Sequence, residues 1–354
     1  MAQGIEKLAK LLADSKITEI MINGPQATWL ELGGKKFKVD VIFSEDDVKD
    51  IIDEYFTKVG KTISYFHPFG DVCLPDGSRV NIIQHPLSRC GTAITIRKFD
   101  RELHSLDDLV VRGTLNQKMA EFLIACIRGR INILFSGATG SGKTTTMEML
   151  SHHIPEQERV VTIEDTAELV LHQDNLVPME TRTPDEHGKG EVSLRDLIRN
   201  ALRMRPDRII VGEVRGPEAL EMIQAMSTGH RGTLAVIHGN SPQEITSRME
   251  TLILSSGIKL PIEEIRRMIG KTLNIIIQQE RSDDGVRRIT HISEVRGVER
   301  NEVGLQDLFI FRRETKDHEG RIQGKFKTVM RNYPRFFPEF QRLGLLDDKA
   351  FSDY

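Results

Sequence analysis

The segment at residues 137–144 reads GATGSGKT, which fits the pattern G-x-x-x-x-G-K-[ST], and it follows an apolar run at 131–136. The glycines let the backbone turn so that several N–H groups point at phosphate oxygens, and the helix that follows adds its positive end. In this pattern Lys143 reaches the β- and γ-phosphates, and the Thr144 hydroxyl binds Mg²⁺. The sequence therefore predicts a strand, a phosphate-binding loop and a helix, with ATP and Mg²⁺ as ligands. The expected nucleotide contacts are Gly137, Ala138, Thr139, Gly140, Ser141, Gly142, Lys143, Thr144 and Thr145.

Around this loop, helical and strand-like patterns alternate along the chain. Apolar residues at helical spacing alternate with short apolar runs, and this order predicts a mostly parallel sheet flanked by helices. The expected helices are 117–128, 142–153 and 194–203, and the expected strands are 131–136, 160–164 and 208–213.

The first hundred residues have a different pattern. Amphipathic helices are expected at 5–12 and 45–60, among strand-like runs at 19–22, 28–31, 35–43, 71–74, 79–83 and 92–99. Charged residues then dominate 100–108, which is typical of a linker. We therefore predict an α/β protein with a small N-terminal α/β domain at 1–100, a linker at 101–115, and a nucleotide-binding domain with a C-terminal tail at 116–354.

Composition excludes several classes of protein. A length of 354 residues suits two domains, and the 39% hydrophobic and 29% charged residues are those of a globular chain. The net charge of −3 argues against a general nucleic-acid binder. No run approaches the ~20 apolar residues that span a bilayer, so any membrane association is expected through a partner or surface contact. The three cysteines have no metal-type spacing.

Hydrolysis of ATP also needs groups that orient water and neutralise charge. Glu164 and Glu213 end two apolar strands, and carboxyl ends of parallel strands line the ligand crevice. Such a strand usually ends in an aspartate that is often followed by a glutamate, and here Gly212 takes the position of the aspartate. Glu213 is therefore expected to act on the Mg²⁺ water shell and Glu164 on the attacking water. The alternative is that both acids are helix caps or surface ion pairs. His238, at another strand end, is either a γ-phosphate sensor or a structural histidine.

Arginine stabilises charge on a transferring phosphoryl group, often from a neighbouring subunit. Arg199 and Arg203 lie four residues apart on one helix face, before the Glu213 strand. In the first domain, Arg79 follows a turn and Arg97 lies in a strand. From the residues alone, any of the four is either a catalytic contact or ordinary surface charge.

Three further segments, together with the phosphate loop, resemble the ATPases that power type II secretion, type IV pili and type IV secretion. They are TIEDTAEL at 162–169, RMRPDRIIVGEVRG at 203–216 and TGHRGTLAVIHGNSP at 228–242. In that family the four motifs are called Walker A, Asp box, atypical Walker B and His box, and they occur here in the same order. The resemblance implies that the glycine before Glu213 is a family trait.

Within this superfamily the chain is most similar to the CpaF-type ATPases of tight-adherence (Flp) pilus assembly. The similar segments are EIMINGP at 19–25, LPDGSRVN at 74–81, ITIRKF at 94–99, LQDLFIF at 305–311 and GRIQGKF at 320–326. The resemblance extends from about residue 17 to about residue 343. Only about 16 residues precede it, where CpaF-type proteins usually carry a longer helical extension, and TVMRNYP at 328–334 fits loosely.

This resemblance implies a hexameric ring in which each subunit joins a small N-terminal domain to a RecA-like motor. It implies that ATP lies between the domains, that Arg79 and Arg97 close on it, and that Arg199 and Arg203 match the arginines before the Walker B strand. The implied partner is an inner-membrane platform protein that moves pilin subunits, with the motor at the cytoplasmic face of that membrane and no nucleic acid involved.

Three alternatives remain open. The same enzyme could serve type IV secretion or conjugation, against which the two tail segments argue. It could be a RecA-like nucleic-acid translocase, which four tyrosines and one tryptophan disfavour because such proteins stack bases on aromatic rings. It could also be a scaffold that binds nucleotide without turnover.

Overall fold

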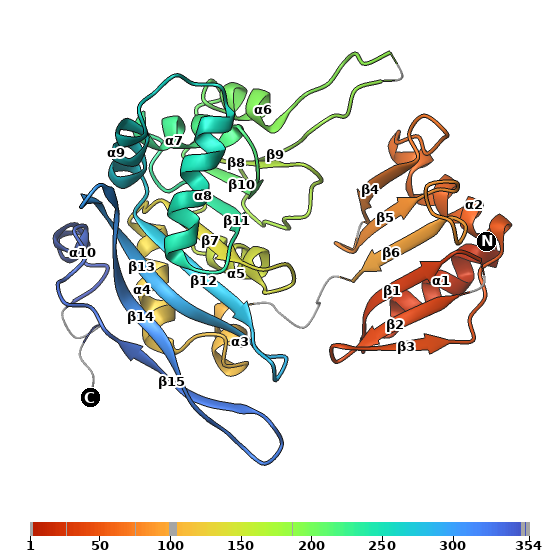
Figure 1. The fold of residues 1–354 in the computed structure, drawn as a ribbon, viewed down its shortest axis with the longest axis horizontal. Helices are drawn as coiled ribbons and strands as arrows, with labels where there is room; N and C mark the ends of the chain where they lie inside the picture. Colours follow the sequence, from red (N-terminus) through yellow and green to blue (C-terminus); the bar gives the residue numbers. More distant parts are fainter. Residues whose placement is uncertain are drawn as a thin grey trace. The chain divides into compact units, whose positions relative to one another are not determined.

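The computed structural model describes residues 3–25, 27–74, 76–98, 105–185, 187–347 and 351. These residues group into two compact units, and the helices and strands of the first are red to orange in Figure 1 while those of the second are gold to blue. The first unit is Met1–Leu103 with the short segments Thr166–Glu168 and Thr183–Glu191. The second unit is His104–Asp165, Leu169–Arg182 and Val192–Tyr354.

The first unit is a six-stranded antiparallel sheet in the order β3-β2-β1-β6-β5-β4. Its core forms because alternate residues of the strands, such as Ile20 and Ile22, are buried against apolar side chains of the helices. A capping box at Ser44 and Asp47 begins the second helix. The elements are α1 (Gln3–Ala13), β1 (Ile17–Asn23), β2 (Thr28–Leu32), β3 (Lys35–Val39), α2 (Glu45–Tyr55), a 3-10 turn (Thr57–Val59), β4 (Phe69–Cys73), β5 (Arg79–Ile83) and β6 (Ala93–Arg97).

The second unit is built on a nine-stranded sheet in the order β15-β14-β13-β12-β7-β11-β10-β8-β9. The six strands from β12 to β9 are parallel, and β13, β14 and β15 add to that sheet in antiparallel pairs. The strands are β7 (Ile133–Gly137), β8 (Val160–Glu164), β9 (Leu176–Glu180), β10 (Arg208–Val214), β11 (Leu234–His238), β12 (Ile275–Arg281), β13 (Arg287–Glu299), β14 (Glu302–Lys316) and β15 (Ile322–Thr328).

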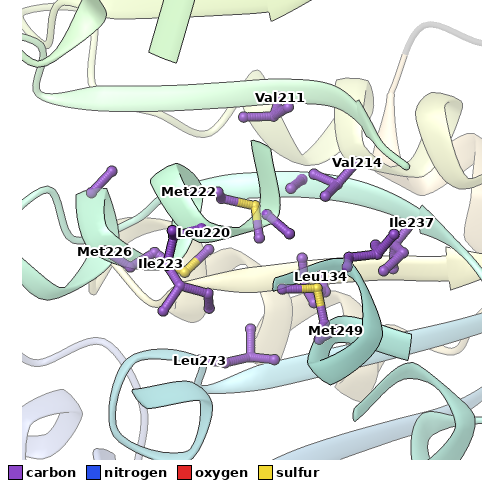
Figure 2. Close-up of a cluster of buried hydrophobic side chains, with 14 of the residues drawn as sticks. Leu134, Val211, Val214, Leu220, Met222, Ile223, Met226, Ile237, Met249 and Leu273 are labelled. Carbon is purple, nitrogen blue, oxygen red and sulfur yellow. The ribbon is translucent and has the colours of Figure 1, made fainter. Parts of the chain in front are cut away.

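Helices cover this sheet. A large apolar cluster joins β10, β11 and β7 to α7 and α8, with Met222 and Met249 among its members (Figure 2). Leu134 belongs to that cluster, whereas the equally buried Ile133 and Phe135 point to the opposite face because side chains alternate along a strand. The helices are α3 (Leu106–Val111), α4 (Gln117–Arg128), α5 (Lys143–Ser151), α6 (Leu194–Ala201), α7 (Glu218–Ser227), α8 (Pro242–Ser255), α9 (Ile262–Thr272) and α10 (Phe337–Arg342).

The observed architecture confirms the predicted α/β class, with a small sheet domain and a larger, mostly parallel sheet. A helix, α3, lies inside the segment 101–115 that the sequence predicted as a linker, of which 101–104 fall outside the described residues. Its acidic residues Asp107 and Asp108 occupy the first helical turn, where negative charge is stabilised. Among the described residues, no helix has the length and apolar character needed to cross a membrane.

Candidate active site

The phosphate loop connects the fully buried strand β7 to the start of α5. Gly140 and Gly142 have φ values of 74° and 97°, in the left-handed region that favours glycine. A Cβ added at Gly137 would lie 2.1 Å from the carbonyl oxygen of Gln279, so only glycine fits there. Lys143 is 6% exposed, and its Nζ donates to the carbonyl oxygen of Ala138 at 2.8 Å. The lysine is therefore held against the loop that the sequence predicted it would serve.

Two glutamines that sequence reasoning missed support the loop from β12. Ser136 Oγ donates to Gln278 Oε1 at 2.6 Å, and Thr146 Oγ1 donates to Gln279 Oε1 at 2.9 Å. Consecutive side chains of a strand point to opposite faces of the sheet, so Gln278 contacts Ser136 on β7 while Gln279 contacts Thr146 on α5. Their signal in the sequence is a polar pair directly after the apolar run 275–277.

Glu164 ends β8 with its side chain buried, at 4% exposure. Its Oε1 accepts a hydrogen bond from the backbone N–H of Leu169 at 3.1 Å. A Cβ added at Gly212, on the neighbouring strand β10, would lie 2.8 Å from Glu164 Cγ. The Glu164 side chain thus occupies the volume that a larger residue at 212 would need, which gives a physical reason for the departure seen in the sequence.

His238 and Glu213 lie at the ends of the two strands between β7 and β8. His238 pairs in register with Gly137, the first residue of the phosphate loop. Its Nε2 lies 3.6 Å from Glu213 Oε1, and both side chains are partly exposed. Burial and the nearby Lys143 charge lower the pKa of His238, while Glu213 acts in the opposite direction. The histidine is therefore a neutral hydrogen-bonding group near neutral pH.

A third carboxylate lies beside Glu164. Glu148, on α5, is 5% exposed. Burial, with a contribution from the Glu164 charge, raises the pKa of Glu148 to about 7. Glu148 was not among the residues predicted for the site, although its place between Met147 and Met149 in a buried helix is a signal present in the sequence.

The four candidate arginines are distributed over both units. Arg199 Nη2 lies 2.7 Å from Glu221 Oε1, and Glu221 is buried on α7. Arg203 is exposed just after α6. For the described residues, no hydrogen bond or ion pair is seen between either arginine and the phosphate loop.

Arg79 and Arg97 lie directly opposite each other on β5 and β6 of the first unit. They therefore project from the same face of that sheet. Arg79 contacts Asp71 at 3.5 Å and Glu168 in the short segment that belongs to the same unit.

The oxygen donors near the loop suit Mg²⁺, which prefers a few carboxylate or hydroxyl ligands together with substrate phosphates. Thr144 lies in the first turn of α5, beside Lys143. Within the part of the chain that is described, no group of three or more His, Cys, Asp or Glu side chains forms a dedicated metal site. This donor set fits a metal that arrives with the nucleotide.

Comparison with known families assigns the chain. The family model described as "Type II/IV secretion system protein" matches residues 1–303. The chain belongs to this family. The broader resemblance seen in the motifs is thereby confirmed, while the closer, CpaF-type assignment is not tested by the family model.

Curated relatives include a VirB11 protein and a conjugal transfer protein. The chain is 31% identical over 301 residues to the protein VirB11 of Agrobacterium fabrum, covering 77% of this chain and 87% of VirB11. It is 29% identical over 299 residues to a putative conjugal transfer protein of Mycobacterium tuberculosis H37Rv, covering 82% and 84% of the two chains.

Solved structures with the same fold include two ATPases. The Legionella pneumophila ATPase DotB has a TM-score of 0.60 at 20% identity and covers 84% of this chain and 81% of its own. The pilus retraction motor PilT, solved with bound ADP, has a TM-score of 0.59 at 19% identity. The match covers 96% of this chain and 87% of PilT. At these identities the likeness establishes the fold alone, which is RecA-like.

Proposed function

We propose that this chain hydrolyses ATP as the motor of a pilus or secretion system. The observation that carries the proposal is the position of His238, in register with Gly137 and 3.6 Å from Glu213. A phosphate-binding loop beside a neutral histidine and a partly exposed carboxylate has the groups that bind nucleotide and activate water.

The roles follow from the chemistry of each side chain. The loop N–H groups and Lys143 hold the β- and γ-phosphates of ATP. Water adds to the γ-phosphorus as the bond to the leaving ADP oxygen breaks, giving ADP and phosphate. Glu213 orients that water and accepts its proton, Glu164 polarises it from β8, and neutral His238 donates to a γ-phosphate oxygen. Mg²⁺, when bound, would supply charge neutralisation, with Thr144 as a ligand and Glu213 acting through water.

Glu213→Gln tests the catalytic assignment. This variant should bind a fluorescent ATP analogue as the wild type does and lose at least about a hundredfold in kcat. Lys143→Ala should lose binding. Unchanged turnover in Glu213→Gln would remove Glu213 from the mechanism. Binding without turnover in the wild type would instead support a nucleotide-binding scaffold.

We further propose a ring of six copies in which Arg79, Arg97, Arg199 and Arg203 neutralise charge on the nucleotide, in the same or a neighbouring subunit. Light scattering with a non-hydrolysable ATP analogue would measure the assembly mass. A monomer under all conditions would contradict the ring, and Arg→Gln variants with unchanged kcat would remove the corresponding arginine.

As the process that ATP hydrolysis drives, we propose assembly of a Flp-type pilus through an inner-membrane platform protein, at the cytoplasmic face of that membrane. The segments 305–311 and 320–326, similar to CpaF-type tails, support this reading and lie on the adjacent strands β14 and β15. Type IV secretion or conjugation is the second candidate, favoured by the VirB11 and conjugal transfer relatives.

Deletion of the gene, complemented by the wild type or by Glu213→Gln, would distinguish pilus assembly from secretion or conjugation. Loss of surface pili that only the wild type restores supports the pilus. Normal pili with lost conjugation or secretion supports the second candidate. ATPase activity stimulated manyfold by DNA or RNA would favour a nucleic-acid translocase over both.

A further inference from the structure

The sheet order separates the two ends of the nucleotide site. Glu164 and His238 are the last residues of β8 and β11, Glu213 is the next-to-last of β10, and all three strands lie on one side of β7. Strands β12 and β13 lie on the other side of β7. Because the γ-phosphate must face the groups that hydrolyse it, the nucleoside end of ATP points toward β12 and β13.

One cationic side chain reaches the phosphate loop from that second side. Arg287 is the first residue of β13, and its Nε donates to the carbonyl oxygen of Gly140 at 3.1 Å. A Cβ added at Gly142 would lie 3.1 Å from Arg287 Cδ, so the stem of the arginine also lies against the loop. Arg287 was not among the residues that the sequence predicted for the site.

The turn that precedes Arg287 is held by buried hydrogen bonds. The next residue, Arg288, makes two hydrogen bonds of 2.8 Å to the two carboxylate oxygens of Asp284. Both of these side chains are buried, and Asp284 also accepts from the backbone N–H of Ile322 at 2.9 Å. The Arg288 guanidinium and these hydrogen bonds hold the pKa of Asp284 well below its usual range. A paired, two-pronged contact of this kind fixes the backbone on which Arg287 stands.

We propose that Arg287 contacts the nucleoside half of bound ATP, the ribose and base, and so contributes to the affinity for ATP and ADP alike. A guanidinium suits this role because its planar fork both donates hydrogen bonds and stacks on aromatic rings. The inference rests on the proposed function, since it assumes that nucleotide binds at the phosphate loop.

The test compares three ligands on the full chain: ADP, a slowly hydrolysed ATP analogue, and inorganic triphosphate, which has no nucleoside. Affinities are measured with Mg²⁺ by calorimetry or by competition with a fluorescent nucleotide. Arg287→Gln should raise Kd for ADP and for the ATP analogue by about the same factor, roughly tenfold or more. The Kd for triphosphate should change less than about twofold. Arg287→Lys, which retains the charge, should be intermediate.

Arg312→Gln, an exposed arginine on β14, is the matched control and should leave all three affinities unchanged. An unchanged ADP affinity in Arg287→Gln, or an equal loss for triphosphate, would overturn the assignment. Wild-type protein that binds no ATP would contradict the proposed function itself, whereas binding that Lys143→Ala abolishes and Arg287→Gln leaves intact would contradict only the role of Arg287.

Discussion

Glu164 and Gly212 compete for one volume at the edge of the sheet where β8 and β10 end. The carboxylate side chain of Glu164 lies where a side chain on residue 212 would project, with 2.8 Å between its Cγ and an added Cβ. A P-loop ATPase usually carries an aspartate at the position of Gly212. Here the Glu164 side chain from the neighbouring strand fills that volume, so residues 164 and 212 are structurally coupled.

Gly212→Asp should therefore lower the free energy of unfolding by about 1–3 kcal/mol through overpacking, and also place a second charge beside Glu164. The double variant Glu164→Ala with Gly212→Asp removes the competing side chain and should recover most of that loss. Urea unfolding of the wild type, both single variants and the double variant gives the coupling energy. A coupling of about 0.5 kcal/mol or more is expected for residues in contact. Strictly additive effects would contradict the shared volume.

The titration of His238 tests the electrostatics of the site. Its pKa is lowered by burial and by Lys143, and is raised by Glu213. Lys143→Ala should therefore raise the pKa of His238, and Glu213→Gln should lower it further. NMR of the imidazole C2–H protons, assigned with His238→Gln, measures both shifts. An unchanged or lowered pKa of His238 in Lys143→Ala would show that the histidine does not sense the loop lysine. His318, which is exposed on the β14–β15 turn, provides a control titration.

Much of the fold could be predicted because its signals are local. The bounds of α4 match the sequence prediction, since Asn116 caps the helix and Gly129 follows its last residue. The long strands β13 to β15 were not predicted as strands. Burial along β13 changes from one stretch to the next, and its sequence therefore lacks the strict alternation that identifies a half-buried strand.

The candidate active site likewise contains residues that a local motif identifies and residues that only the fold brings together. The phosphate loop is continuous in sequence, so its residues could be named from one motif. Gln279 and Arg287 lie more than a hundred residues further on, and only the order of strands in the sheet brings them to the loop. The burial of Glu148 near Glu164 depends on how α5 packs on β7 and β11, which no local pattern encodes.

Removing one partner of the buried ion pair at the opposite end of β10 should destabilise the fold strongly, because it leaves the other charge buried. Arg208 is fully buried, and its Nε lies 2.5 Å from Glu158 Oε2, while Arg130 Nη2 lies 2.9 Å from Glu158 Oε1. Glu158→Ala leaves the Arg208 charge buried without this partner, and should cost about 3–5 kcal/mol. Glu339→Ala breaks the more exposed pair with Arg231 and should cost about 1 kcal/mol or less. Similar losses in the two variants would contradict the buried pair's role.

Glu148 should make the stability of the chain fall as the pH rises. Folding raises its pKa from an ordinary value of 4.5 to about 7, so the folded state favours the protonated carboxyl. The free energy of unfolding should decrease between about pH 4.5 and 7 from this group, by up to about 3 kcal/mol. Glu148→Gln removes that dependence and should be more stable than the wild type at pH 8. The exposed Glu121→Gln is the control, because its charge is solvated in both states. A Glu148→Gln variant whose stability depends on pH as the wild type does would show that the buried carboxyl stays ionised on folding.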